Sequence, residues 1–202
     1  FRGGQLRLQD PADPLQMAAA GAALALGVPV SEIEAAAAEV TAPPGRLETY
    51  RGRHGLGVVI DYAHTGHALE TALSALRPHT RGLLWCVFGC GGNRDSAKRP
   101  AMGAVAERLA DRVVLTDDNP RDEDPASIVQ QILAGVRSPD AVRSIHDRRE
   151  AIATVIAEAS KEDLVLVAGK GHERVQERGG ERFPFSDVDV VRELLDHEGD
   201  AA

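Results

Sequence analysis

The segment Asp118–Arg121 places a carboxylate, an amide and a guanidinium around a proline that stiffens the turn. A further guanidinium, Arg94, lies at the tip of a glycine-rich loop earlier in the chain. Two guanidiniums can each form a forked pair with a carboxylate, while Asp118 and Asn119 can accept hydrogen bonds from an ammonium. This set of side chains suits an amino acid with more than one charged end.

The glycine-rich loop itself, Gly89–Asp95, fits neither of the common nucleotide-binding patterns. The third glycine of G-x-G-x-x-G is replaced by Arg94, and no G-x-x-x-x-G-K-[ST] occurs anywhere in the chain. What remains is a flexible backbone that another group can approach closely. Arg94 at its tip is either an anion ligand or an ordinary solvated charge.

Three other loops carry charged side chains. In Asp61–Thr65, the carboxylate of Asp61 and the imidazole of His64 either contact a nucleotide or metal, or merely hold the turn together. Gly169–Glu173 exposes backbone at two glycines and offers Glu173 as an ammonium acceptor, and the alternative is a glycine turn with solvated charges. The last loop, His146–Arg149, is interpreted as a helix cap with surface charges and no ligand.

The elements that must position these loops are short, nearly all-apolar strands alternating with helical patterns. Strands without polar alternation are buried on both faces, so the sequence predicts a doubly wound, mostly parallel α/β sheet of Rossmann-like type. In such a sheet ligands bind outside the carboxyl ends of the strands, where all five loops fall. The predicted strands are Gly57–Asp61, Leu83–Phe88, Arg112–Thr116, Val142–Ile145 and Leu164–Ala168, with a lead-in strand at Leu47–Arg51 and an edge strand at Arg182–Phe185.

Helix-start signals agree with this arrangement. Asp124 precedes Pro125 at a first helical position, Asp147 stands three residues before Glu150, and Ser186 can cap the last helix.

The first 44 residues have a different character. A Pro/Asp-rich stretch, Asp10–Pro14, precedes an alanine-rich helix to about Leu26, and Ser31 with Glu34 form a capping box for a second helix ending near Val40. Thr41–Gly45 is typical of a linker. Two small helices cannot bury a core of their own, so residues 1–44 are expected to be the tail of a preceding domain and residues 45–202 a domain by themselves.

Composition excludes several classes of function. A net charge of -8 without a Lys/Arg run argues against nucleic-acid binding. The longest apolar stretch, Met17–Val28, is too short to span a membrane, and we expect no membrane partner. The chain begins with Phe1 and shows no export signal, so we expect an excised fragment of a cytoplasmic protein. Cys86 and Cys90 lack a second Cys/His pair to complete a zinc site and are expected to be unbridged thiols.

Five motifs in this order resemble the Mur ligases, and most closely the tripeptide synthetases that add meso-diaminopimelate. The resemblance covers about residues 45–195, the whole C-terminal domain of those enzymes, while residues 1–44 resemble the tail of their central ATPase domain. The motifs are Gly45–Glu48, Asp61–Thr65, Trp85–Asp95, Asp118–Arg121 and Gly169–Glu173.

The resemblance implies a peptidoglycan-forming ligase. In that family ATP phosphorylates the γ-carboxylate of D-glutamate on the UDP-N-acetylmuramoyl dipeptide, and the amine of the incoming amino acid attacks the acyl phosphate. The C-terminal domain holds that amino acid and closes over the ATP site. The phosphate loop and the groups that bind Mg²⁺ belong to segments absent from this chain, so we expect the chain to be inactive alone, with no catalytic residue and no metal ligand of its own, and to be a monomer.

Site residues follow from the same resemblance. The motif Asp118, Asn119, Pro120 and Arg121 marks the enzymes that use meso-diaminopimelate. Positions matching the other diaminopimelate contacts are Arg94, Gly169 and Glu173, and those facing the nucleotide are Arg46, Asp61 and His64.

Two departures from the family pattern stand out. Gly66 and His67 replace the proline and the acidic or amide residue that usually follow Asp61–Thr65, and Asp10–Gln16 replaces an asparagine-containing stretch.

Physical chemistry separates diaminopimelate from lysine. Lysine lacks the distal carboxylate, so a buried arginine fork would be left unpaired at a cost of roughly 2–5 kcal/mol. Two alternatives stay open from the sequence: a non-catalytic amino-acid-binding module derived from such a ligase, and a lysine-adding relative.

Overall fold

The computed structural model describes residues 14–39, 44–52 and 54–197. The chain divides into two compact units, Phe1–Ala42 and Pro43–Ala202. The first unit contains helices α1 (Pro14–Ala25) and α2 (Val30–Glu39). Whether residues 1–44 form the tail of a preceding domain stays a prediction.

The capping box predicted for α2 is wrong. The helix begins at Val30, one residue before Ser31, because the carbonyl of Pro29 already accepts hydrogen bonds from the amides of Glu32 and Ile33. Ser31 is therefore inside the first turn instead of at its cap. Pro14 begins α1, whereas the rest of the predicted Pro/Asp-rich stretch, the helix end near Val40 and most of the linker lie outside the described residues.

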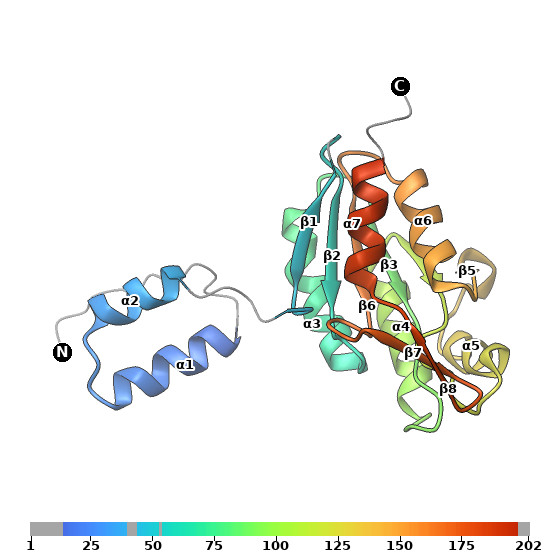
Figure 1. Cartoon of the computed structure of the whole chain (residues 1–202), viewed down its shortest axis with the longest axis horizontal. Coiled ribbons are helices and arrows are strands. Elements are labelled where there is room, and N and C mark those ends of the chain that lie inside the picture. Colours follow the sequence, from blue (N-terminus) through green and yellow to red (C-terminus); the bar gives the residue numbers. More distant parts are fainter. Residues whose placement is uncertain (1–13, 40–43, 53, 198–202) are drawn as a thin grey trace. The chain divides into compact units, whose positions relative to one another are not determined.

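The second unit is built on a six-stranded sheet with the order β1-β2-β6-β3-β4-β5 (Figure 1). β1 is antiparallel to β2, and the remaining neighbours are parallel, which confirms the mostly parallel α/β sheet. The strands are β1 Glu48–Arg51, β2 Gly57–Asp61, β3 Leu84–Phe88, β4 Arg112–Leu115, β5 Arg143–Ser144 and β6 Leu164–Ala168.

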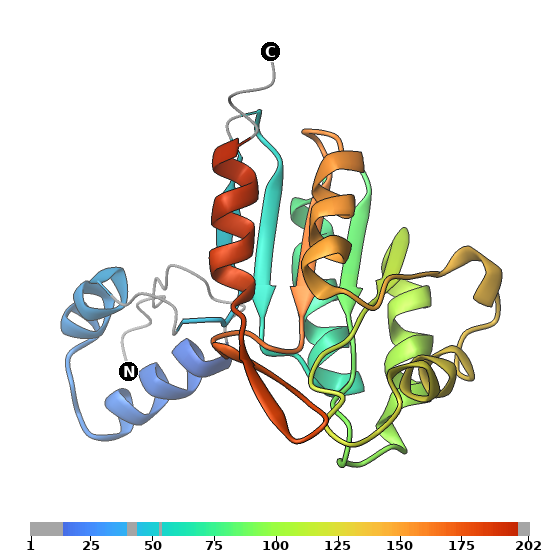
Figure 2. The ribbon, with the colours of Figure 1, turned by 45° about the vertical axis from the view of Figure 1, so that its right-hand side comes forward.

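Helices cover both faces of this sheet. Connections from β2 to β3, β3 to β4 and β4 to β5 all step in one direction, whereas the connection from β5 to β6 steps back, so right-handed crossovers place the helices on opposite faces. Figure 2 shows α6 and α7 in front of the sheet and α3 behind it. The helices are α3 Gly66–Leu76, α4 Lys98–Leu109, α5 Pro125–Leu133, α6 Arg148–Glu158 and α7 Asp187–His197, with short 3-10 turns η1 Arg77–His79 and η2 Pro139–Ala141.

The register brings the strand ends to a common edge. Asp61 of β2 pairs with Ala168 of β6, which also pairs with Phe88 of β3, and Phe88 pairs with Leu115 of β4. Because these strands are parallel, the loops that follow them leave the sheet side by side.

The predicted edge strand at Arg182–Phe185 does not join this sheet. β7 (Val175–Arg178) and β8 (Glu181–Pro184) pair with each other as a separate hairpin. Gly179 and Gly180 both have positive φ, 59° and 77°, which gives the tight two-residue turn that favours local pairing. In Figure 2 the hairpin lies at the end of the sheet toward which the strand arrowheads point.

The prediction that His146–Arg149 carries surface charges is wrong for one residue, Arg148. Asp147 caps α6 as expected, since its side chain accepts a hydrogen bond from the amide of Glu150, 2.9 Å away. Arg148, however, is fully buried: its Nε and Nη2 donate to Asp187 at 2.7 and 2.8 Å, and Nη2 also donates to the carbonyl of Ala168 at 3.0 Å. This buried ion pair fastens the starts of α6 and α7 to the end of β6. The caps at Asp124 and Ser186 are confirmed.

We expect Asp187→Ala to lower the free energy of unfolding by about 3–5 kcal/mol, because it leaves the buried guanidinium of Arg148 without its counter-charge. Urea unfolding of the chain measures this loss. The matched control is Glu193→Ala, which removes the exposed Arg149–Glu193 pair between the same two helices and should cost at most about 1 kcal/mol.

A double variant, Arg148→Met with Asp187→Leu, should recover most of the lost stability, because two apolar side chains of similar size avoid burying charge. Equal losses from Asp187→Ala and Glu193→Ala would contradict the structural importance given to the buried pair.

Candidate binding site

A cavity of about 380 Å³ opens among the loops at the carboxyl ends of the strands. It is the place where most of the residues singled out in the sequence come together. Those lining it are His64, Arg94, Asp118, Asn119, Arg121, Gly169 and Glu173, whereas Arg46, Asp61 and Pro120 do not line it.

The two arginines flank the same glycine. A Cβ atom placed on Gly91 would lie 3.0 Å from Arg121 Nη1 and 3.8 Å from Arg94 Cγ. Arg94 is exposed, and no hydrogen bond or ion pair joins its side chain to another described residue. Arg121 instead donates from Nε to Glu177 and from Nη1 to the carbonyl of Gly92, both at 2.8 Å. The cavity therefore has one free guanidinium beside one that is held in place.

Asp118 is the buried carboxylate of the site. Burial raises its pKa, and the nearby charges of Arg148 and Lys170 only partly oppose this effect. Gly169 fits against it with a φ of 115°, where a Cβ atom would lie 2.5 Å from an Asp118 oxygen. A glycine is required here because any side chain would be both strained and in collision with the carboxylate.

A buried lysine organises the other acceptors. Lys170 has no exposed surface, and its Nζ donates to Asn119 Oδ1 at 2.9 Å and to Glu173 Oε2 at 3.0 Å. Burial alone would raise the pKa of Glu173, but hydrogen bonds from Asn119 and Lys170 outweigh it and hold that pKa below its usual value. Glu173 is thus kept as a carboxylate that faces the cavity.

Asn119 lines the cavity as predicted, but its side chain has a different role from the predicted one. Its Oδ1 accepts from Lys170 and also from the amide of Glu177 at 3.0 Å, and its Nδ2 donates to Glu173 at 2.8 Å. A carbonyl oxygen has two lone pairs, so the oxygen predicted to accept from an ammonium is already fully used. Asn119 positions Glu173 and leaves Asp118 and Glu173 as the acceptors for a ligand.

The loop that follows β4 packs closely against the glycine-rich loop Gly89–Asp95. A Cβ atom on Gly92 would lie 1.9 Å from the carbonyl oxygen of Pro120, and the Gly92 amide donates to the carbonyl of Asn119 at 2.8 Å. The loops after β3 and β4 therefore pack backbone to backbone. Pro120 forms this contact and not the cavity wall.

The residues assigned to the nucleotide side form a second group, at the end of β2. The guanidinium of Arg46 lies over the ring of Tyr62 at 4.9 Å, and the rings of His64 and His172 lie 4.7 and 5.4 Å from Tyr62. Asp61 accepts a hydrogen bond from the amide of Leu47 at 2.9 Å, so its carboxylate ties β1 to β2.

Several features of the site escaped the sequence interpretation. Lys170 and His172 lie inside the Gly169–Glu173 motif, but the sequence pattern distinguishes neither of them from solvated charges of a glycine turn, and Tyr62 has no signal beyond its motif. Glu177 lies in an ordinary strand pattern, so nothing local distinguishes it.

Three further findings concern metal ligands, thiols and membrane-spanning helices. Within residues 14–39, 44–52 and 54–197, no three or more His, Cys, Asp or Glu side chains gather as metal ligands. Cys86 and Cys90 are free and buried, and burial raises the pKa of each thiol to about 12. No helix in the described part of the chain has the length and apolar character needed to cross a membrane.

Comparison with known proteins adds independent findings. A family model described as Mur ligase, glutamate ligase domain, matches residues 45–171. Curated relatives include proteins from Acidovorax sp. (strain JS42), 51% identical over 181 residues, and Pseudomonas aeruginosa, 50% identical over 179 residues. Both are named UDP-N-acetylmuramoyl-L-alanyl-D-glutamate--2,6-diaminopimelate ligase. The matches cover 88% and 89% of this chain but 36% and 37% of the relatives, so the chain spans little more than a third of their length.

Solved structures of Mur ligases also match the fold of this chain. One of a ligase with the same name matches with a TM-score of 0.74 and 41% identity, over 92% of this chain and 38% of that one. The UDP-N-acetylmuramate-alanine ligase of Thermotoga maritima matches with a TM-score of 0.68 at 16% identity, over 100% of this chain and 41% of that one, and shows a shared fold alone.

We expect Asp118→Asn to make the chain more stable at pH 7. Because the pKa of Asp118 is higher in the folded chain than in the unfolded one, its ionisation opposes folding at neutral pH, and this cost disappears as the pH falls toward the ordinary aspartate value, about 4. Urea unfolding from pH 7 downward should show the stability difference shrinking.

The control for this experiment is Asp140→Asn, at an exposed position in η2, which should change neither the stability nor its pH dependence. If Asp118→Asn were less stable at pH 7, attraction to Arg148 and Lys170 would outweigh the burial of the carboxylate.

Proposed function

The chain belongs to the Mur ligase family, and on that premise we propose that it is the amino-acid-binding C-terminal domain of an ATP-dependent ligase acting in peptidoglycan synthesis. The proposed reaction joins meso-diaminopimelate to UDP-N-acetylmuramoyl-L-alanyl-D-glutamate. The observation that supports it best is the cavity in which Arg94 and Arg121 stand beside Asp118 and Glu173.

The charges of this cavity complement the proposed amino acid. Diaminopimelate carries a carboxylate and an ammonium at each end, and guanidiniums and carboxylates are their natural partners. Arg94 has its full set of donors available, and Arg121 adds a second guanidinium across Gly91. Asp118 and Glu173 supply acceptors that the protein leaves facing the cavity.

Lysine fits the same cavity less well. It has no second carboxylate, so one guanidinium covered by the bound ligand would lack a partner, and where the ligand buries that charge the cost is roughly 2–5 kcal/mol. Because about 1.4 kcal/mol corresponds to a tenfold change in affinity, this cost amounts to roughly 30-fold or greater discrimination against lysine. The presence of two guanidiniums, Arg94 and Arg121, in one cavity therefore supports diaminopimelate over lysine.

The domain contributes binding and orientation to the reaction. Holding the amino acid by both charged ends restricts the directions in which its reacting amine can point, which favours attack on an acyl phosphate presented by the rest of the enzyme. In this proposal the described residues neither transfer the phosphoryl group nor bind the metal.

ATP and Mg²⁺ are proposed for the complete enzyme. A cation and aromatic rings at Arg46, Tyr62 and His172 offer a stacking surface that suits a purine base. The chain holds no phosphate loop, so the phosphates and Mg²⁺ would be bound by another domain, whose tail we propose residues 1–44 to be. We also propose a cytoplasmic location, which a nucleotide-linked substrate and ATP would favour, and a monomeric state.

In the complete ligase, Arg94→Ala should raise the KM for diaminopimelate roughly 30-fold or more and leave the KM for ATP nearly unchanged. Arg121→Ala should act in the same direction. Initial rates of phosphate release, with each substrate varied in turn, measure both constants. Because the Arg94 side chain has no partner among the described residues, its loss should not alter the thermal unfolding temperature.

Arg81→Ala is the matched control, since this exposed arginine precedes the amino end of β3, opposite the cavity. Its kinetic constants should equal those of the wild type. Equal increases in the two KM values of Arg94→Ala would refute its assignment to the amino acid.

A further inference from the structure

Arg121 has a backbone conformation that ordinary residues avoid. Its φ is 52°, in the left-handed region where an L side chain is crowded. Such a conformation persists only where the surroundings hold it. The β7–β8 hairpin does so from both sides, because the Arg121 amide donates to the Glu177 carbonyl at 2.9 Å and the Gly179 amide donates to the Arg121 carbonyl at 2.7 Å.

The same hairpin holds the Arg121 side chain. A guanidinium has five N–H donors. Nε donates to Glu177 Oε2 and one Nη1 hydrogen goes to the carbonyl of Gly92, both at 2.8 Å. Nη2 makes no hydrogen bond with the residues that the structure describes, and the side chain lines the 380 Å³ cavity. Glu177 thus fixes the plane of the guanidinium while leaving part of it available to a ligand.

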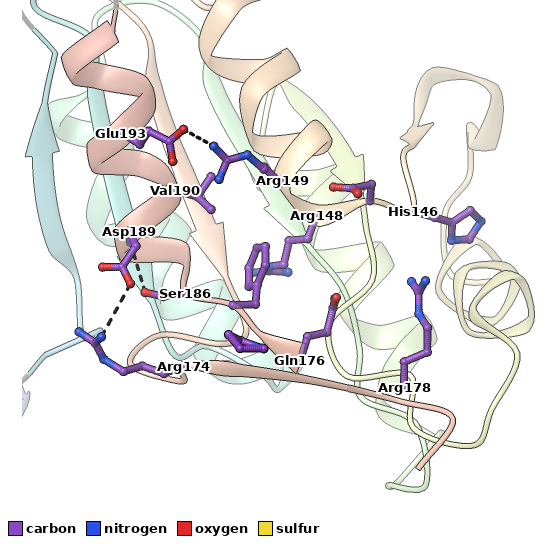
Figure 3. A pocket seen from close by; sticks show the side chains of 13 residues that line it. His146, Arg148, Arg149, Arg174, Gln176, Arg178, Ser186, Asp189, Val190 and Glu193 are labelled. Atoms are coloured by element: carbon purple, nitrogen blue, oxygen red, sulfur yellow. Dashed lines mark hydrogen bonds and ion pairs between the residues drawn. The ribbon is translucent and has the colours of Figure 1, made fainter. Parts of the chain in front are cut away.

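Alternation along β7 singles out Glu177. Its neighbours Gln176 and Arg178 line a different cavity, of about 600 Å³, between the hairpin and the first turns of α6 and α7 (Figure 3). Successive strand side chains point to opposite faces, which directs Glu177 toward Arg121. Glu177 is therefore the β7 side chain that contacts a residue of the candidate binding cavity through an ion pair.

The Glu177 carboxylate is itself anchored. Its Oε1 lies 3.6 Å from Arg182 Nε on β8, while its Oε2 accepts from Arg121. With a cation at each oxygen, the carboxylate has little freedom to rotate away. The position of the Arg121 guanidinium is consequently set by the hairpin together with the Gly92 carbonyl, and not by the loop that carries it.

We propose that Glu177 is a positioning residue that sets how Arg121 meets the second carboxylate of the amino acid, and that it thereby helps to select diaminopimelate over lysine. This inference rests on the proposed function. Lysine has one carboxylate and lacks the second one, which this proposal assigns to Arg121, so a misplaced Arg121 guanidinium weakens the use of diaminopimelate and leaves the use of lysine unchanged. A role in folding alone would affect both amino acids alike.

The test compares variants of the complete ligase by phosphate release with diaminopimelate, with lysine and with ATP varied. Glu177→Ala should raise the KM for diaminopimelate on the order of tenfold or more. The ratio of kcat/KM for diaminopimelate to that for lysine should fall by the same factor, with the KM for ATP unchanged. Glu177→Gln should recover most of the loss, because its amide oxygen still accepts from Arg121 Nε.

Glu181→Ala is the matched control: this glutamate lies in β8 of the same hairpin, is exposed, and should behave as wild type. If Glu177→Ala does not fold, Glu177→Asp replaces it, and the shorter side chain should shift the same ratio in the same direction by a smaller factor.

A Glu177→Ala enzyme with an unchanged ratio, whether both activities are retained or fall together, would overturn the inference while leaving the proposed function in place. A wild-type enzyme that releases no phosphate in response to diaminopimelate would instead overturn the proposed function, and this inference with it.

Discussion

Charge that is buried at the carboxyl edge of the sheet must be paired, and this constraint shapes the candidate site. The ammonium of Lys170 and the guanidinium of Arg148 are both shielded from water, where an unpaired cation would be very costly. Lys170 therefore fixes Asn119 and Glu173, and Arg148 fixes Asp187 together with the end of β6. Glu173, an acceptor that faces the cavity, is therefore held in position by the buried Lys170.

Close backbone packing turns separate loops into one unit. Gly92 meets Pro120, and Gly169 meets Asp118, at distances that a side chain would not permit. The hairpin adds hydrogen bonds to the Asp118–Arg121 loop from Gln176 and Glu177. Rigid loops of this kind can hold charged groups at a fixed spacing, which a site for a multiply charged amino acid requires.

The site also keeps charges that the protein does not fully satisfy. Arg94 has no partner among the described residues, and burial raises the pKa of Asp118 against the nearby cations. The burial of the Asp118 carboxylate reduces stability, whereas the exposed guanidinium of Arg94 is solvated and costs little, and a ligand can supply a partner to both.

The sequence by itself determined the sheet, most helix caps and the loops that meet at one edge, because apolar runs, capping residues and glycines act locally. It placed Arg94 and Arg121 at one rim through the rule that parallel strands end together. Only the tertiary structure decided that Arg148 and Lys170 are buried, that the Asn119 oxygen is already occupied, and that Glu177 holds Arg121. Most of these pairings join residues 39 to 58 positions apart in the sequence, such as Arg148 with Asp187 and Asn119 with Glu177, and no local pattern records them.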